Sequence, residues 1–385
     1  MYRLNEEQTA TIEGLRRIAD EQISPYAADV DEKARFPREA LEALAQAGWL
    51  GLTVPTEYGG QGQGMRVACA TLDEIAQRCA STAMIYLMHL CGCACYTAHA
   101  NGHEDTLRQV ANGEHLSTLA WSERGSRSHF WAPVSQAEQN DGQVVLRAQK
   151  SFVTSAGIAD GYVVSTRAPN GTETTDTLDT TLYLVRNEDE GLRVNGTWNS
   201  MGMRGNASAP MVLEDCQVPT ERELSEPGQG FPRMMEILPW FNLCNAAIST
   251  GIAEAATQAT ITHLTAARLE HMNSRLADLP NLRARLAQMR IETDRSRAHL
   301  ASALDAVESA APDAMLLVLA SKAAAADAAK HVIDLGMQAC GGAAFSKHLT
   351  LERNFRDGRA ASVMAPTSDV LHDFIGRALC GMELF

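Results

Sequence analysis

The first part of the chain carries apolar residues at the three- and four-residue spacing of helices. Near the N-terminus this spacing links Leu15, Ile18, Ala19 and Ile23. A second amphipathic stretch begins after Pro37 and ends at Gly48, which is where helices favour proline and glycine. The run 79–98 is apolar on all sides, as in a helix buried inside a large protein. We predict a helical N-terminal domain over residues 1–117.

The pattern changes between residues 118 and 222. Short runs rich in β-branched and aromatic residues are typical of strands, and turn residues separate them. These runs are QVVLRAQK (143–150), YVVSTRA (162–168) and TLYLVR (181–186). We predict an antiparallel unit that forms a central β-barrel domain.

From residue 223 to 385 the pattern is helical again. Three long alanine-rich helices are expected at 251–272, 281–309 and 314–340, and a shorter one at 366–380. Pro312-Asp313 precedes the third, and Gly341-Gly342 follows it. We predict a C-terminal four-helix bundle. The fold class is therefore α+β and multidomain: helices, then a β-barrel, then a bundle, with no G-x-G-x-x-G turn for a Rossmann nucleotide site.

Composition narrows the function classes. The net charge of −14 argues against nucleic acid and against an anionic membrane surface as partners. The run 79–98 is rich in small and polar residues, so we expect no membrane span. The N-terminus has no secretory pattern and the nine cysteines are an odd number, which favours reduced thiols in a cytoplasmic protein. No cysteine or histidine spacing suits a metal site.

Five stretches, in this order along the chain, are similar to the acyl-CoA dehydrogenase family. They are LAWSERGS (119–126), KSFVTSAGIADGYVVSTRA (150–168), MGMRGNASAPMVLEDCQVP (201–219), QACGGAAFSKHLTLERNFRDGRAA (338–361) and APTSDVLHDFIGR (365–377). The resemblance covers nearly the whole chain.

The resemblance implies a flavoenzyme. FAD would lie between the β domain and the bundle of a homotetramer or homodimer, with its adenosine half reaching the neighbouring subunit. The substrate would be an acyl thioester of CoA or of a carrier protein, and the electron acceptor is open. In such enzymes a carboxylate removes the α-proton while a hydride passes to the flavin, and a backbone N–H stabilises the thioester oxygen.

Carried over residue by residue, the resemblance gives a cofactor set. Its members are Trp121, Ser122, Phe152, Thr154, Arg268, Gln338, Gly341, Gly342, Thr367 and Asp369. Three of these have plainer alternatives that stay open. Thr154 would also suit a strand surface, the glycine pair would also stop a helix, and Asp369 would also cap the last helix.

The resemblance likewise gives a substrate set. Ser126 lies where the family contacts CoA, and Met84 and Leu87 lie near the expected floor of the acyl pocket. Ala365 stands at one of the two positions where family members carry their base, and Asn242 is next to the other. The bulk of Met84, Tyr86 and Leu87 favours a short or compact acyl group.

The catalytic base is missing from both of its usual positions. Ala365 stands where a glutamate is expected, and Phe241 occupies the alternative position. Alanine accepts no proton, although its backbone N–H still donates a hydrogen bond. The remaining candidates each have a more ordinary interpretation as a core or surface residue; they are His89, Glu123, Cys244, Asp369 and His372.

Three hypotheses follow for function. The first is an FAD-dependent acyl-thioester oxidoreductase with a relocated base or an unusually acidic substrate. The second is another flavin reaction on this fold, such as oxygen-dependent hydroxylation. The third is a non-catalytic subunit of a heteromeric complex. Arg353, Arg356 and Asp357 are expected to form a structural ion-pair network rather than a catalytic group.

Overall fold

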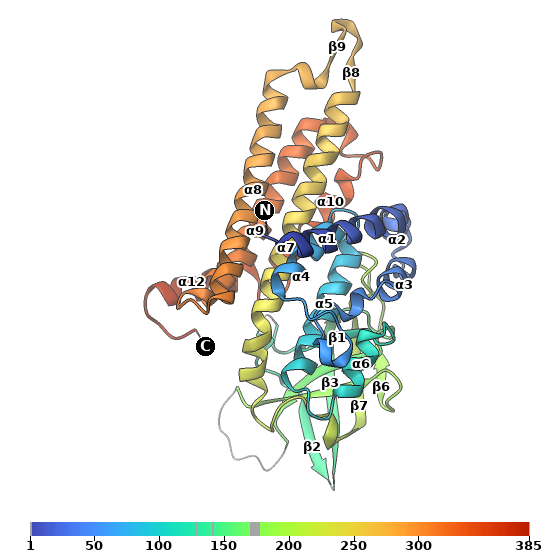
Figure 1. The fold of residues 1–385 in the computed structure, drawn as a ribbon, viewed down its shortest axis with the longest axis vertical. Coiled ribbons are helices and arrows are strands. Elements are labelled where there is room, and N and C mark those ends of the chain that lie inside the picture. Colours follow the sequence, from blue (N-terminus) through green and yellow to red (C-terminus); the bar gives the residue numbers. More distant parts are fainter. Residues whose placement is uncertain (1, 128, 141, 170–177, 385) are drawn as a thin grey trace.

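The structure, a computed structural model, describes residues 2–127, 129–140, 142–169 and 178–384. Its N-terminal part is helical, and Asn5 caps the first helix by accepting a hydrogen bond from the backbone N–H of Gln8 at 2.8 Å. Figure 1 shows these helices in blue to teal, beside the long C-terminal helices. They are α1 (Glu6–Ile18), α2 (Ala27–Lys33), α3 (Arg38–Gln46), α4 (Met65–Ala76), α5 (Ala80–Ala98) and α6 (Glu104–Ala111).

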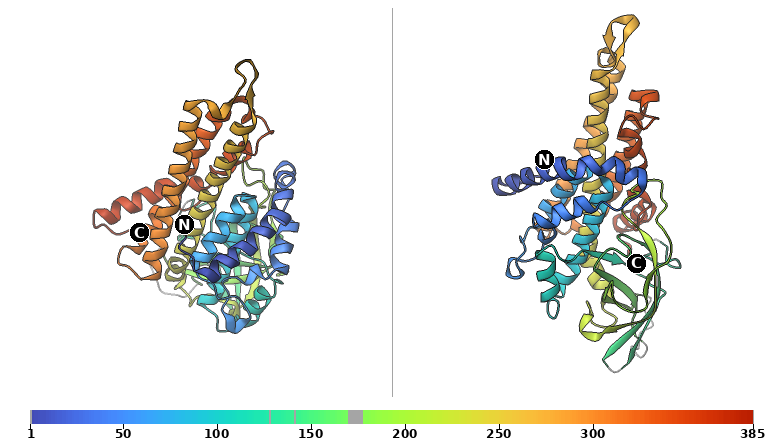
Figure 2. Two further views of the ribbon diagram at one scale, coloured as in Figure 1. Left: turned by 45° about the horizontal axis from the view of Figure 1, so that its top comes forward. Right: turned by 90° about the vertical axis from the view of Figure 1, so that its right-hand side faces the viewer.

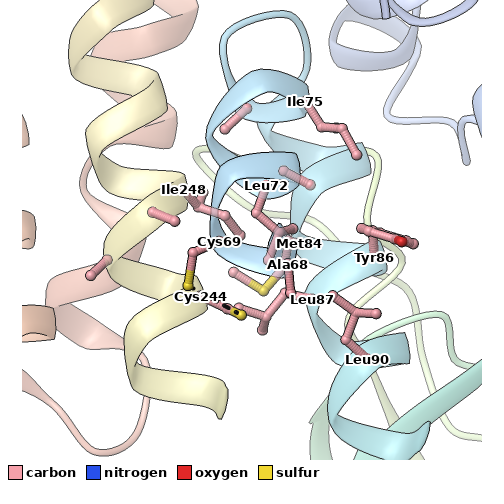
Figure 3. Packing of buried hydrophobic residues seen from close by; sticks show 14 of the residues in the cluster. Ala68, Cys69, Leu72, Ile75, Met84, Tyr86, Leu87, Leu90, Cys244 and Ile248 are labelled. Carbon is pink, nitrogen blue, oxygen red and sulfur yellow. Dashed lines mark hydrogen bonds between the residues drawn. The ribbon is translucent and has the colours of Figure 1, made fainter. Parts of the chain in front are cut away.

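Helix α5 is buried on nearly every side, which explains its uniformly apolar sequence. Its residues Met84 and Leu87 pack with Leu72 of α4 and with Cys244 and Ile248 of the long helix α7 (Gly230–Ala266) (Figure 3). This shared core joins the N-terminal helices to the C-terminal ones. Within the described part of the chain, no helix is both long and apolar enough to cross a membrane.

The central strands form two sheets that pack against each other. One sheet has the order β1-β4-β5 and the other the order β2-β3-β7-β6. Small and branched side chains fill the space between them, including Val144, Leu146, Val164 and Val185. The strands are β1 (Ser117–Ala120), β2 (Gln136–Asn140), β3 (Gln143–Val153), β4 (Gly161–Arg167), β5 (Thr180–Arg186), β6 (Leu192–Val194) and β7 (Ala209–Pro219).

The sheets differ from the sequence prediction in one pairing. Strand β1 runs parallel to β4, with Ser117 opposite Gly161, although an entirely antiparallel unit was expected. The chain between them includes β2 and β3, which belong to the other sheet, so β1 and β4 meet through a crossover rather than a hairpin. Local strand patterns do not specify such a crossover.

Three long helices dominate the C-terminal part: α7, α8 (Pro280–Glu308) and α9 (Ala314–Cys340) (Figures 1 and 2). Helix α7 begins much earlier than the predicted residue 251 and ends before 272, because the chain turns into the short hairpin β8 (Arg268–Leu269) and β9 (Ser274–Arg275). The last helices are α10 (Leu351–Asp357), α11 (Ala360–Val363) and α12 (Ser368–Leu379), and α12 packs against α9.

One cluster of charges fastens three distant segments together. The Arg356 guanidinium binds both carboxylate oxygens of Asp31, at 2.8 and 2.5 Å, and also Glu352 on its own helix. It donates a further hydrogen bond to the carbonyl of Met201 at 3.1 Å. The neighbouring Asp357 accepts the N–H of Met203 at 2.6 Å. The ion-pair network predicted at 353–357 therefore connects α2, α10 and the loop 198–208.

Loop 198–208 approaches α10 so closely that only glycine fits at residue 202. A Cβ atom there would lie 2.5 Å from the carbonyl carbon of Arg356. We expect Gly202→Ala to lower the free energy of unfolding by about 1–3 kcal/mol, because the backbones must separate. Thermal unfolding measures this loss. Gly14→Ala is the control, since its Cβ meets no atom within 4 Å and α1 should become slightly more stable. Equal behaviour of the two variants would contradict the close approach.

Asp357 makes stability depend on pH. Burial raises its pKa to about 6, above the ordinary value of 3.8, so the folded chain binds this proton more tightly than the unfolded chain. The contribution of Asp357 to stability therefore falls as pH rises from about 4 to above 6. Asp357→Asn keeps an acceptor for the N–H of Met203 and does not titrate. We expect the variant to gain up to about 3 kcal/mol relative to the wild type over that pH range. Parallel stability curves from pH 4 to 7 would refute this.

Candidate active site

A cavity of about 1010 Å³ lies where the β sheets meet the helices. The loop after β1, the end of β3 and loop 198–208 form one side, and α7 and residues 356–367 form the other. Its volume is at the upper end of the range typical of cofactor and substrate sites. An apolar part of the wall comes from Met84, Met88, Leu119, Leu238 and Phe241.

Aromatic side chains line the sheet side of the cavity. The Trp121 ring stacks on Phe130 with a centroid separation of 5.8 Å. Phe152 is 69% exposed, and its positive φ of 56° turns the chain at the end of β3. Its ring meets Trp198 edge to face at 6.3 Å. These residues offer a flat apolar surface for a planar ligand.

Two polar features sit on the same wall. The indole Nε1–H of Trp121 is buried and has no acceptor among the described residues. The Thr154 and Ser208 hydroxyls lie 3.0 Å apart, both buried and both at the cavity. A buried N–H without an acceptor costs free energy, so a ligand that accepts from Trp121 would bind favourably here.

Glu123 is the single carboxylate among the described residues that line the cavity. It is almost fully buried and lies 2.5 Å from the Lys150 ammonium. It also accepts hydrogen bonds from the hydroxyl of Ser135 and from the backbone N–H groups of Val134 and Ser135. Burial alone would raise the pKa of Glu123, but Lys150 and these hydrogen bonds together lower it. Glu123 is therefore a fixed structural anion that is poorly suited to take a proton.

The opposite wall contains the two empty base positions. Ala365 and Phe241 both line the cavity, so a methyl group and a phenyl ring stand at the two positions where the sequence resemblance led us to expect a carboxylate. The backbone N–H of Ala365 has no acceptor among the described residues.

A buried lysine holds this wall from behind. Lys322 on α9 donates to the carbonyls of Ala361, Met364 and Pro366 at 2.9, 3.0 and 2.7 Å. Burial lowers the pKa of Lys322 to about 7, while three carbonyl acceptors match the three N–H groups of its charged form. Sequence reasoning missed Lys322, although a lysine between the apolar run 315–320 and the alanines 323–326 was a visible signal.

Arginines provide the remaining charge of the cavity. Arg356 and Arg359 are held by Asp31 and Asp334, respectively. Arg124 and Arg127 are exposed and form no ion pair with a described residue. The rim of the cavity is therefore cationic in a chain that is acidic overall, which suits an anionic group on a ligand.

The other candidate bases are elsewhere. His89 accepts the N–H of Ser117 on Nδ1 and lies 2.9 Å from the Leu50 carbonyl through Nε2, so both ring nitrogens are paired. Burial lowers its pKa to about 4. Cys244 is buried beside Cys69, with the two sulfur atoms 3.9 Å apart. Asp369 and His372 are exposed on α12. None of the four lines the cavity.

The structure brings together nine of the residues selected from sequence. The residues that line the cavity are Met84, Trp121, Ser122, Glu123, Phe152, Thr154, Phe241, Ala365 and Thr367. Ser126, Leu87 and Asn242 are buried next to it without lining it. Asp369 lies in the exposed first turn of α12.

Four predicted cofactor residues lie far from the cavity within this chain. Gln338 is about 24 Å along α9 from Lys322, and Gly341 and Gly342 follow it. Gly341 ends α9 with a positive φ of 58°, so the helix-stop interpretation holds for that glycine. Arg268 lies in the hairpin that follows α7.

The chain matches three domain models along its length. The acyl-CoA dehydrogenase N-terminal domain matches residues 5–114, the middle domain 118–216 and the C-terminal domain 228–380. A probable acyl-CoA dehydrogenase of Mycobacterium tuberculosis, FadE25, is 29% identical over 389 residues, covering 98% of this chain and 97% of that protein.

Solved structures share the fold. Butyryl-CoA dehydrogenase from Megasphaera elsdenii superposes with a TM-score of 0.91 at 22% identity, covering 98% of this chain and 99% of that one. PigA with FAD and proline gives 0.89 at 18% identity, covering 99% of both chains. At these identities the likeness concerns the fold alone. With its three domain models matched in order, the chain belongs to the acyl-CoA dehydrogenase family.

Proposed function

We propose that the protein is an FAD-dependent oxidoreductase that acts on an acyl thioester. The observation that carries this proposal is the cavity itself. One of its walls is aromatic and contains the unpaired N–H of Trp121, and the opposite wall contains Ala365, whose backbone N–H is a further donor. Family membership and the acyl-CoA substrates named for relatives support the same reading. When bound, FAD would supply the hydride acceptor.

The residues at the cavity fit a flavin. Phe152 and Trp121 would flank the ring system, the Trp121 N–H would donate to a polar ring atom, and Thr154 would donate through its hydroxyl. Ser122 and Thr367 lie on the same surface. The donors and the apolar area match a large heteroaromatic group with several acceptor atoms.

The four predicted cofactor residues that lie far from the cavity support an assembly of several copies of the chain. Arg268, Gln338, Gly341 and Gly342 would reach only the cofactor of a neighbouring subunit, in a homotetramer or homodimer. Phe345, just beyond the glycines, is 85% exposed, as expected for a side chain that a second copy covers. We place the assembly in the cytoplasm, and we assign residues 1–117, 118–222 and 223–385 to its three domains.

The cavity wall at residues 361–366, which Lys322 holds, would position the substrate. The N–H of Ala365 would donate to the thioester oxygen, and the three hydrogen bonds from Lys322 would keep this backbone in place. No described cavity residue offers a free proton acceptor. We therefore propose that the substrate is a thioester whose α-hydrogen is more acidic than that of a saturated alkyl chain, so that water suffices as the acceptor.

Anaerobic mixing of the flavin-loaded protein with a panel of acyl-CoA esters tests this function. Bleaching of the flavin absorbance by an activated ester is expected, and no bleaching by any ester would reject it. Oxygen uptake by the reduced protein together with formation of a hydroxylated product would favour the hydroxylase instead. A protein that copurifies with a second chain and is inactive alone would favour the non-catalytic subunit.

Restoring a carboxylate should restore simple desaturation. We expect Ala365→Glu to speed flavin reduction by butyryl-CoA by about 10²–10⁴-fold, the usual contribution of a positioned base. Stopped-flow absorbance measures the rate. Ala365→Gln is the control, because it has the same size without the basicity. A wild-type rate equal to that of the glutamate variant would show that another base already operates.

The cationic rim should recognise the phosphates of CoA. We expect Arg127→Ala and Arg124→Ala each to weaken binding of an acyl-CoA by about 3–10-fold. Because both side chains are exposed, salt screens their charges, and the loss of affinity should be smaller at high salt. The matching acyl-pantetheine lacks these phosphates and should be unaffected. Titration calorimetry with both ligands gives the comparison. An equal loss for both ligands would remove the arginines from phosphate recognition.

A further inference from the structure

Two asparagines on α7 have polar atoms without partners deep in the protein. Asn242 is 0% exposed, and neither its amide nitrogen nor its carbonyl oxygen has a hydrogen-bond partner among the described residues. Asn245 is 1% exposed, and its carbonyl oxygen is likewise unpaired. Each buried atom of this kind destabilises the protein if it stays unpaired. Leucine would fill either position without that cost.

The two amides lie directly behind the cavity wall. Leu238 and Phe241 line the cavity from α7, and Asn242 follows one turn after Leu238 on the same face of the helix. Asn245 contacts the other part of this wall, because its amide nitrogen lies 3.6 Å from the sulfur of Met364, which also lines the cavity.

Met364 is the side chain that separates Asn245 from the cavity. A thioether sulfur is a weak acceptor, so an oxygen in its place would bind the Asn245 amide better. Methionine is unbranched and adapts its conformation readily. A movement of Met364 would therefore extend the acyl part of the cavity to Asn245 without a change in the backbone, and Asn242 lies beside Asn245 on the helix surface, three residues earlier.

The unpaired atoms define the kind of group that would fit. They comprise one NH₂ group and two carbonyl oxygens, so a partner must both donate and accept. A carboxylate donates nothing, and the nearby Lys322 already directs its N–H groups to three carbonyls. An alkyl chain would leave the amides unpaired. A hydroxyl or an uncharged amide satisfies both requirements.

We propose that Asn242 and Asn245 form a polar subsite for an acyl group that carries an uncharged hydroxyl or amide. The proposal rests on the proposed function, because it names the acyl class of the same thioester. In the complex, the substrate group displaces Met364 from Asn245, donates to a carbonyl oxygen of the pair and accepts from an amide nitrogen.

Pairs of ligands that differ only in OH against CH₃ test the subsite. 4-Hydroxybutyryl-CoA is compared with pentanoyl-CoA, 5-hydroxypentanoyl-CoA with hexanoyl-CoA, and 6-hydroxyhexanoyl-CoA with heptanoyl-CoA. Titration calorimetry on the flavin-loaded protein reads binding without turnover. For at least one pair, the hydroxyl ligand is expected to bind about tenfold more tightly, which is the effect of one well-formed hydrogen bond.

Variants then assign the preference to the asparagines. Asn242→Leu and Asn245→Leu should each abolish or reverse the preference and should tighten binding of the alkyl partner. Cys244→Ala is the matched control, because its side chain faces Cys69 rather than the cavity, and it should keep the wild-type preference.

The outcomes separate this inference from the function on which it rests. Wild-type protein that binds every alkyl ligand as tightly as its hydroxyl partner overturns the subsite while leaving thioester binding intact, and this comparison needs no variant. A hydroxyl preference that survives in both leucine variants overturns it too. Protein that binds no acyl-CoA at all overturns the subsite and the proposed function together.

Discussion

The Arg356–Asp31 ion pair is the contact on which the shape of the cavity depends. Through it, α10 is tied to α2 at the other end of the sequence, and the same guanidinium holds the Met201 carbonyl of loop 198–208. Asp357 secures the next turn of that loop through Met203. The cavity lies between segments from all three regions of the chain, so its walls keep their spacing only while this charged cluster keeps them together.

The ionisable groups around the cavity either form ion pairs or hydrogen bonds within the protein or face solvent. Glu123 neutralises Lys150, and Lys322 organises three carbonyls behind Ala365. His89 links α5 to two backbone segments in its neutral form. The reaction centre of this family member is thus apolar with cationic edges. Under the proposed function, such a site would bind a flavin and an anionic carrier and would leave water to accept the substrate's α-proton.

An alanine in place of a glutamate removes a proton acceptor, and it also changes the charge and the packing of the cavity wall. A buried carboxylate beside a flavin imposes a charge that the surroundings must solvate, and its absence lets Phe241 and Met364 pack at the wall. Behind this wall, both amide atoms of Asn242 and the carbonyl oxygen of Asn245 lack partners among the described residues. The family fold has been kept, and under the proposed function the selectivity of its cavity would rest on a different set of residues.

Local patterns and motifs were enough to predict the family, the order of helical and β regions, and part of the cavity wall, because motif residues such as Trp121, Thr154 and Ala365 lie in segments whose local structure follows from their own pattern. It also indicated that both base positions are empty. The folded chain was needed to show that β1 pairs in parallel with β4, that Lys322 supports Ala365, and that the Asn242 amide and the Asn245 carbonyl oxygen lack partners among the described residues. These features depend on contacts between residues far apart in the chain, and local periodicity carries no information about them.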